Sequence, residues 1–136
     1  MTEMIKKYGL KMFLAGFLAG TAVFTVMAFK SGNDIPAEPR EIVLVSKNVN
    51  FYNEGKMDEP NPTLTLRKGE PVKLVLRNDD PGTLLHCFVI PGLNVKTTES
   101  LAGGESEILL FTPRERGGYV YACLLHPAMA GKLVVE

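Results

Sequence analysis

Two different hydrophobic patterns divide this chain. Residues 12–29 form a run of eighteen residues without a charge, and Lys6, Lys7 and Lys11 precede it. From Glu41 onward, apolar residues come in short runs, several of them alternating with polar residues, and turn residues separate the runs. The first pattern is typical of a membrane-inserted helix, and the second is typical of β-strands with one buried face.

The second pattern predicts an all-β domain. No helical periodicity of useful length is present after Glu41, whereas glycine and proline clusters such as Asp80-Pro81-Gly82 mark frequent turns. About seven short strands in ninety-six residues favour a small β-sandwich or barrel. Residues 48–62 are less regular, which indicates an edge excursion or a turn of helix. The strands are expected at residues 41–46, 63–67, 71–77, 84–90, 105–111, 119–122 and 132–135.

The apolar run at residues 12–29 has two interpretations. It is just long enough to cross a bilayer as a helix, and it also has the layout of an export signal. Because the lysine flank should stay in the cytoplasm, the rest of the chain is expected in the periplasm or at the outer face of the cytoplasmic membrane. Val26-Met27-Ala28 fits a cleavage site. The run is longer than most signal cores, so an uncut membrane anchor is favoured over a cleaved signal peptide.

These patterns predict three parts: a signal-anchor or signal peptide at residues 1–30, a polar linker at 31–40, and one domain at 41–136. The fifteen Lys and Arg residues balance the fifteen Asp and Glu residues. Without a basic surplus, nucleic acid is not an expected partner. Two cysteines do not make a disulfide scaffold, so the domain must fold on its own core.

The side chains that suit a soft metal are few and clustered. The only histidines and cysteines are His86 next to Cys87, and Cys123 followed by His126, with Met129 three residues later. One thiolate, two imidazoles and a weak axial thioether are the donor set of an electron-transfer copper site. The pattern therefore predicts one copper, cycling between Cu(I) and Cu(II), with His86, Cys123, His126 and Met129 as its ligands.

The residues around these ligands resemble the cupredoxins, the blue type 1 copper proteins. The segment YVYACLLHPAMAGKLVVE at 119–136 resembles their C-terminal copper loop, and its Cys-x2-His-x2-Met spacing is similar to that of amicyanin and shorter than in plastocyanin-like loops. The segment KGEPVKLVLRN at 68–78 resembles the strand before the first histidine, and His86 with Phe88 fits that histidine's position. The resemblance covers residues 41–136 and implies a Greek-key β-sandwich with copper at the same four residues.

Cys87 departs from the family pattern, because many cupredoxins have an asparagine after the first histidine that braces the ligand loop. A thiol donates hydrogen bonds poorly, so a looser loop is expected, and a disulfide with Cys123 becomes a risk without copper. The favoured alternative follows from strand alternation: Cys87 is a small buried residue that faces away from the metal.

Other sites built from the same residues fit less well. A structural zinc site would use both cysteines and both histidines, but His86 and Cys87, adjacent on a strand, would point to opposite faces. A Cys–His catalytic pair would lack an orienting partner and an oxyanion hole. The binuclear copper domain of terminal oxidases needs a second cysteine in the loop, where this chain has Pro127. The protein is therefore not expected to be an enzyme.

The expected function is electron transfer between a redox donor and an acceptor, such as a cytochrome, an oxidase or a dehydrogenase. His126 is expected to be the solvent-facing ligand, within an apolar contact patch from residues 81–85 and 127–128. The alternative is an extracytoplasmic copper-binding carrier or delivery protein. Such a protein usually has further methionines or histidines, and beyond Arg40 the chain has only Met57 besides Met129. A redox enzyme domain would need a further metal or an open coordination position.

Overall fold

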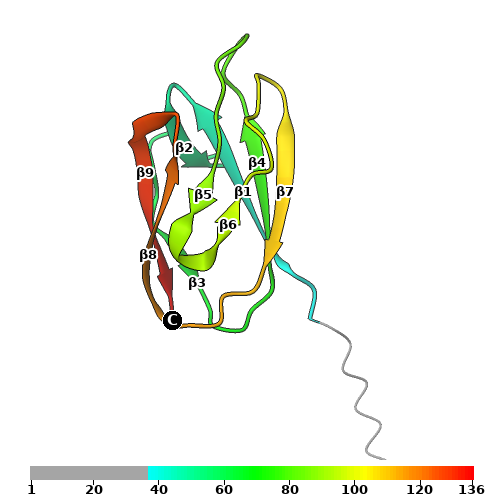
Figure 1. Cartoon of the computed structure of the whole chain (residues 1–136), viewed down its shortest axis with the longest axis vertical. Coiled ribbons are helices and arrows are strands. Elements are labelled where there is room, and N and C mark those ends of the chain that lie inside the picture. The colour runs from blue at the N-terminus through cyan, green and yellow to red at the C-terminus, as the bar shows by residue number, and fades with distance from the viewer. Residues whose placement is uncertain (1–36) are drawn as a thin grey trace, which may run out of the picture. The chain divides into compact units, whose positions relative to one another are not determined.

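The computed structural model describes residues 37–136, which fold into two β-sheets (Figure 1). The apolar run at 12–29 and its expected helix lie outside the described residues. Within residues 37–136, no helix is long and apolar enough to cross a membrane. The only helical element described is a short 3-10 turn, η1 (Pro91–Leu93). The prediction of an all-β domain is confirmed.

Each sheet contains one parallel strand pair among antiparallel ones. The four-stranded sheet has the order β2 (Asn50–Asn53), β1 (Arg40–Lys47), β4 (Val72–Asn78), β7 (Ser106–Phe111), with β1 and β4 parallel. The five-stranded sheet has the order β3 (Leu64–Leu66), β9 (His126–Val135), β8 (Gly117–Cys123), β5 (Val89–Ile90), β6 (Val95–Lys96), with β3 and β9 parallel. The chain therefore crosses between the sheets several times, and residues far apart in sequence become neighbours.

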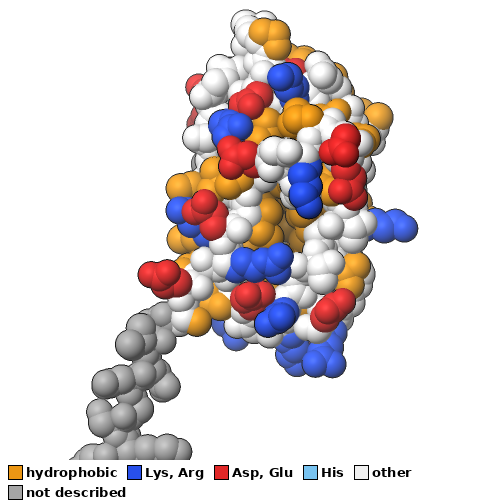
Figure 2. All heavy atoms as spheres, turned by 180° about the vertical axis from the view of Figure 1, so that it is seen from behind, with side chains coloured by type: hydrophobic (Ala, Val, Ile, Leu, Met, Phe, Trp, Pro, Cys, Tyr) orange, Lys and Arg blue, Asp and Glu red, His pale blue; other side chains and the backbone are white. Residues whose placement is uncertain are grey.

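Charged side chains of both signs are mixed on the surface. On the face shown in Figure 2, Lys and Arg are interspersed with Asp and Glu and with apolar side chains. Within residues 37–136, opposite charges are also paired: the Arg77 guanidinium lies 2.7 Å from Glu54 and 2.7 Å from Asp79. Exposed pairs of this kind contribute little to stability. This face has no large region of a single charge.

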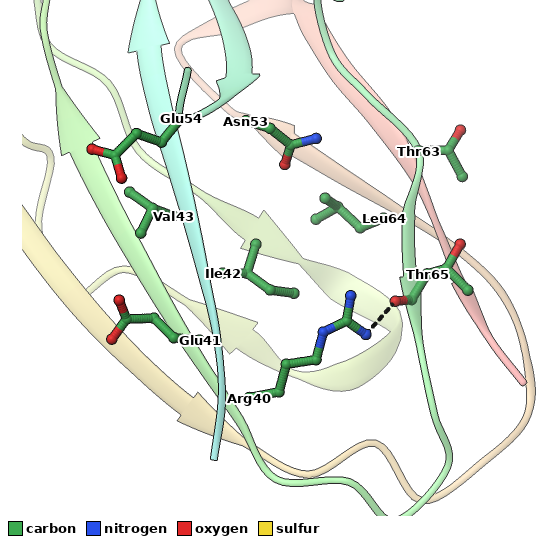
Figure 3. Close-up of a pocket in the computed structure, with 9 residues that line it drawn as sticks. All are labelled: Arg40, Glu41, Ile42, Val43, Asn53, Glu54, Thr63, Leu64 and Thr65. Carbon is green, nitrogen blue, oxygen red and sulfur yellow. Dashed lines mark hydrogen bonds between the residues drawn. The ribbon is translucent and has the colours of Figure 1, made fainter. Parts of the chain in front are cut away.

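A surface pocket of about 360 Å³ lies between β1 and the chain that enters β3 (Figure 3). Ile42 and Leu64 point into it from the two sides, and the Arg40 guanidinium donates a 3.0 Å hydrogen bond to the carbonyl of Thr65. None of the histidines or cysteines lines this pocket. It is therefore separate from the residues expected to bind metal.

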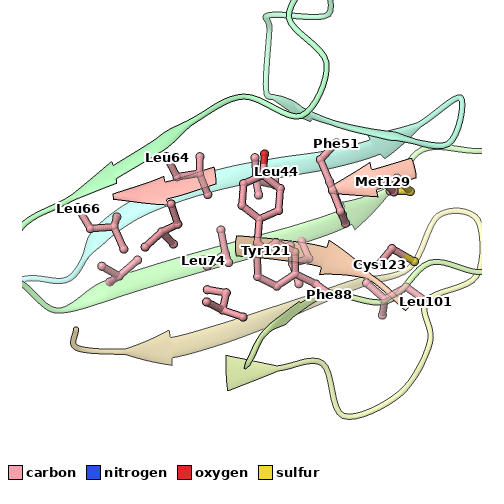
Figure 4. Packing of buried hydrophobic residues seen from close by; sticks show 14 of the residues in the cluster. Leu44, Phe51, Leu64, Leu66, Leu74, Phe88, Leu101, Tyr121, Cys123 and Met129 are labelled. Atoms are coloured by element: carbon pink, nitrogen blue, oxygen red, sulfur yellow. The ribbon is translucent and has the colours of Figure 1, made fainter. Parts of the chain in front are cut away.

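The core lies between the sheets and contains three aromatic rings at its centre (Figure 4). Phe51, Phe88 and Tyr121 have ring centroids 5.5–5.6 Å apart, a spacing at which aromatic pairs add to the burial energy. Leu64 and Leu66 lie toward one end of the core, whereas Cys123 and Met129 lie at the other. The core thus has an aliphatic end and a sulfur-containing end.

Several expected strands have different bounds in the structure. Residues 84–90, expected as one buried strand, contribute only β5, because the chain before it bulges into a loop held by a single bridge between His86 and Leu101. The irregular stretch at 48–62 contains the edge strand β2, which confirms the edge excursion. β8 and β9 extend further toward each other than expected, so only Leu124 and Leu125 remain between them.

Tyr121 connects the core to the long connection between β2 and β3. Its ring is fully buried and covers Gly131 on the neighbouring strand, where any Cβ would overlap the ring. Its hydroxyl donates a hydrogen bond to the carbonyl of Pro62. Burial, with a smaller contribution from the charge of Glu59, raises the pKa of this phenol, so it remains a donor at neutral pH.

Replacing Tyr121 with phenylalanine should destabilise the domain by about 1–2 kcal/mol, because the buried carbonyl of Pro62 loses its partner. Chemical denaturation of residues 37–136 measures this change. Tyr119→Phe is the matched control: its hydroxyl bonds to the carbonyl of Glu115 in solvent, so the change should stay within about 0.5 kcal/mol. Equal effects of the two substitutions would contradict the structural role of Tyr121.

Candidate metal centre

Three of the four predicted ligands converge at one end of the sandwich. One donor atom each from His86, Cys123 and His126 lies within 4.8 Å of the other two. Bonds of about 2.0–2.3 Å from a metal to nitrogen or sulfur put ligands of one ion up to roughly 4–4.6 Å apart. A single ion between the three atoms therefore requires little further movement of the side chains.

Cys123 and His126 are placed by the meeting of β8 and β9. Cys123 ends β8, His126 begins β9, and the two residues are paired directly across the ladder. The register shifts between Ala122 and Cys123, which marks a bulge. Bulges re-aim side chains next to functional sites. The expected short loop is thus a two-residue turn, and Met129 lies within β9 instead of on the loop.

His86 comes from the loop between β4 and β5. It exchanges two backbone hydrogen bonds with Leu101, of 3.0 and 2.7 Å. The side chain of Asn78, itself fully buried, donates to the carbonyls of Leu84 and Leu101, both at 2.8 Å. This buried amide joins the two loops, and it fixes the backbone that carries His86.

The ring of His86 has one nitrogen engaged and one free. Nε2 lies 2.7 Å from Oδ2 of Asp80, and both side chains are buried. Burial opposes ionisation of Asp80, but hydrogen bonds from the Asn48 amide and from His86 outweigh it and lower its pKa. An ionised carboxylate only accepts hydrogen bonds, so Nε2 carries the proton. Nδ1 is buried without a hydrogen-bond partner and has its lone pair available for a metal.

The ring of His126 has the same arrangement. Its Nε2 donates to the carbonyl of Leu85 at 3.0 Å, so the neutral form of the ring has its lone pair on Nδ1. The centroids of the His86 and His126 rings are 4.9 Å apart. His126 is partly exposed, whereas His86, Cys123 and Met129 are at most 1% exposed. His126 is thus the predicted ligand with access to solvent.

Met129 shares the buried sulfur-containing end of the core with Cys123 (Figure 4). It follows His126 by three residues on β9, and it is the first fully buried position of that strand. A thioether is a weak ligand that adjusts a copper site without fixing its geometry. The position of Met129 is compatible with this axial role.

The donor set fits copper: one thiolate, two imidazole lone pairs, and a buried thioether at the same end of the core. The family model of the cupredoxin-like domain matches residues 20–135. The chain belongs to the cupredoxin-like family. Its domain has a His–Cys–His site that could bind one copper.

Solved structures similar to this cupredoxin include an auracyanin from the photosynthetic bacterium Roseiflexus castenholzii, reduced with dithionite. It is 20% identical with a TM-score of 0.57, and the match covers 71% of this chain and 96% of that one. Rusticyanin from Thiobacillus ferrooxidans is 24% identical with a TM-score of 0.57, covering 71% and 76%. A copper binding protein in the apo form is 27% identical with a TM-score of 0.54, covering 71% and 86%. No curated protein matches the sequence.

Cys87 faces Cys123, one of the predicted ligands, so the favoured expectation that it points away from the site is wrong. The two Sγ atoms are 3.6 Å apart, and the Cys87 amide donates to Sγ of Cys123 at 3.3 Å. Strand alternation does not apply, because residues 86–88 are not part of a regular strand. Cys87 lies outside the group of three donor atoms around the candidate metal position.

The expectation of a looser ligand loop rests on the thiol of Cys87 being a poor donor, and it stays a prediction, but the structure shows the sulfur in a different role. The amide of Leu124 donates to Sγ of Cys87 at 3.2 Å, so the thiol acts as an acceptor for the loop. Burial and the neighbouring Cys123 raise the pKa of the Cys87 thiol, against the opposing bond from Leu124. Cys87 therefore remains a neutral thiol at neutral pH, and it holds the turn through a weak sulfur acceptor.

The cavity that touches His86 and Cys87 is about 10 Å³. That is about the space of one water molecule, which leaves no room for an organic substrate. The side chains around His86 and Cys87 are therefore closely packed.

In the absence of copper, Cys87 and Cys123 should form a disulfide when the protein meets a disulfide reagent. The two thiols lose their protons as the reagent is reduced to two thiols, and sulfurs 3.6 Å apart need only a small approach. Mass measurement should show a loss of two hydrogens, and thiol counting should give zero free thiols. Copper-loaded protein should be protected, because its Cys123 thiolate is bound, and Cys87→Ser provides the control. Two persistent free thiols in the copper-free protein would contradict this expectation.

Proposed function

We propose that this cupredoxin binds one copper at His86, Cys123, His126 and Met129 and carries single electrons between redox proteins. The observation that supports this most directly is the convergence of one thiolate and two imidazole donors within 4.8 Å at the buried end of the core. Copper bound there supplies a one-electron Cu(I)/Cu(II) couple.

The surrounding residues favour electron transfer over other chemistry. Cys123 and His86 are almost fully buried, which excludes water from the donor atoms. Hydrogen bonds to Cys123, His86 and His126 fix the donors in position before a metal arrives. A preorganised ligand set changes little between the two copper states, and this keeps the reorganisation during electron transfer small.

The partly exposed His126 is the proposed route by which electrons enter and leave. It lies beside exposed apolar side chains: Leu85, Leu124 and Leu125 are 42%, 73% and 49% exposed. Exposed apolar groups that cluster in this way mark contact surfaces. The proposed partners are a donor and an acceptor protein, such as a cytochrome, an oxidase or a dehydrogenase, that dock over these leucines.

We further propose that the domain works outside the cytoplasm, anchored by residues 12–29. β1 begins at Arg40 and runs along the domain to the turn at Asn48, which contacts Asp80 at the metal end. The uncharged run at 12–29 with Lys6, Lys7 and Lys11 before it supports this proposal. The mass of the mature protein recovered from membranes tests this anchor; a soluble form beginning near residue 29 would refute it.

The oxidised domain should bind one copper and show an intense visible thiolate-to-copper band, and Cys123→Ser should abolish that band. Absorption spectroscopy with copper quantification measures both. Cys87→Ser is the matched control, because it alters the neighbouring sulfur and should retain the colour. Full colour in the Cys123 variant would refute the site.

A copper delivery protein would instead release its metal readily to a chelator and lack a reversible redox couple.

Substitutions of Met129 should shift the reduction potential in opposite directions. Met129→Gln supplies a stronger oxygen donor that stabilises Cu(II) and lowers the potential, whereas Met129→Leu removes the donor and raises it. Each shift should reach at least the order of 59 mV, equivalent to a tenfold change in relative affinity. Voltammetry measures the potentials while copper stays bound; three identical values would remove Met129 from the site.

A further inference from the structure

A buried carboxylate, that of Asp80, contacts the candidate ligand His86. Asp80 is 5% exposed and His86 is 1% exposed, and their side chains meet at 2.7 Å. Burying a carboxylate costs several kcal/mol unless hydrogen bonds compensate, and an apolar pair at such a position is often as stable. Stability alone is therefore a weak explanation for a charge at this position, and the contact with His86 is the feature to be explained.

The two carboxylate oxygens of Asp80 have separate partners. Oδ1 accepts a 2.7 Å hydrogen bond from the amide of Asn48, and Oδ2 faces Nε2 of His86. Asn48 and Val49 form the turn between β1 and β2, and both have left-handed backbones, with φ of 51° and 58°. This conformation is unusual for a β-branched residue such as Val49. The turn nonetheless has this left-handed conformation, which directs the Asn48 amide at the carboxylate of Asp80.

The backbone of Asp80 is also fixed. Its amide donates to the side-chain oxygen of Asn78 at 2.9 Å. Gly103 packs so closely on the carbonyl of Asp80 that a Cβ at this glycine would overlap it. Three separate segments of the chain therefore hold the carboxylate in one place, at residues 48–49, 78 and 103. A side chain held in this way can orient the ring that it contacts.

We propose that Asp80 is a positioning residue that fixes His86 with its proton on Nε2 and lowers the reduction potential of the bound copper. This inference rests on the proposed copper site. The Cys123 thiolate and the Asp80 carboxylate together carry two negative charges. The sum of the charges of Cu(II), the thiolate and the carboxylate would be zero, whereas with Cu(I) the sum would be one negative charge. In a buried environment the neutral state is favoured, so the carboxylate stabilises Cu(II).

Asp80→Asn tests the proposal, because an asparagine oxygen can still accept from the Asn48 amide while the charge is lost. Loss of an outer partner of a metal-bound histidine typically weakens metal binding 10–100-fold. We expect Cu(II) binding to weaken by this factor and Cu(I) binding to weaken less. The reduction potential should therefore rise by about 59 mV for each factor of ten by which the loss of Cu(II) affinity exceeds the loss of Cu(I) affinity.

Asp79→Asn is the matched control. Asp79 is the adjacent residue and loses the same charge, but it pairs with Arg77 near the surface and has no hydrogen bond to His86. Its potential and copper affinities should match those of the wild type. Equal potentials for the wild type and for both variants would overturn the proposed role of Asp80.

A second measurement needs no copper. Nitrogen-15 NMR of the copper-free wild-type protein should show His86 with the proton on Nε2 and the lone pair on Nδ1, and a proton on Nδ1 instead would overturn the positioning role. In Asp80→Asn, this fixed tautomer should be lost. Absence of copper binding by the wild type would refute the proposed function, whereas the tautomer result stands independently of it.

Discussion

A buried imidazole has two nitrogens, and each needs a partner in the folded protein. In His86, one nitrogen donates to the carboxylate of Asp80 and the other is left without a protein partner at the candidate metal position. The need of Nε2 for an acceptor, which Asp80 supplies, explains the arrangement of the residues around Asp80 at this end of the domain. Asn48, Asn78 and Gly103 all act on Asp80, and each lies in a different connection or strand end. The β-sandwich serves to bring these segments together.

At the same end of the domain, three of the four predicted ligands are buried and His126 alone is partly exposed. Cys123 and Met129 are part of the hydrophobic core, so packing holds both sulfurs, and the amide of Cys87 also donates a hydrogen bond to Sγ of Cys123. His126 reaches the surface, and its other ring nitrogen is fixed by the Leu85 carbonyl. A centre that is buried on one side and open through one imidazole suits exchange of an electron better than exchange of the metal.

The sequence was sufficient to predict the features that depend on local order. Alternation in β4 and the spacing of Cys123, His126 and Met129 are properties of neighbouring residues, and both reappear in the structure. Nothing in the sequence marks Asp80, because it lies in a turn-like Asp-Pro-Gly segment. Its contact with His86 depends on Asn48 and Gly103, which are distant in sequence. Strand alternation predicts the wrong orientation for Cys87, because the chain forms a loop there instead of a regular strand.

The position of β9 inside the five-stranded sheet has a consequence for the order of folding. This strand supplies His126 and Met129, and it lies between β3 and β8, so the five-stranded sheet cannot close without it. Its pairing with β3 joins residues 64–66 to residues 133–135, and such long-range contacts form late and slowly. Until β9 has paired with β3 and β8, His126 and Met129 are not placed against His86 and Cys123. The candidate metal site is therefore assembled only when these long-range contacts of the sheet have formed, and its formation reports the completion of folding.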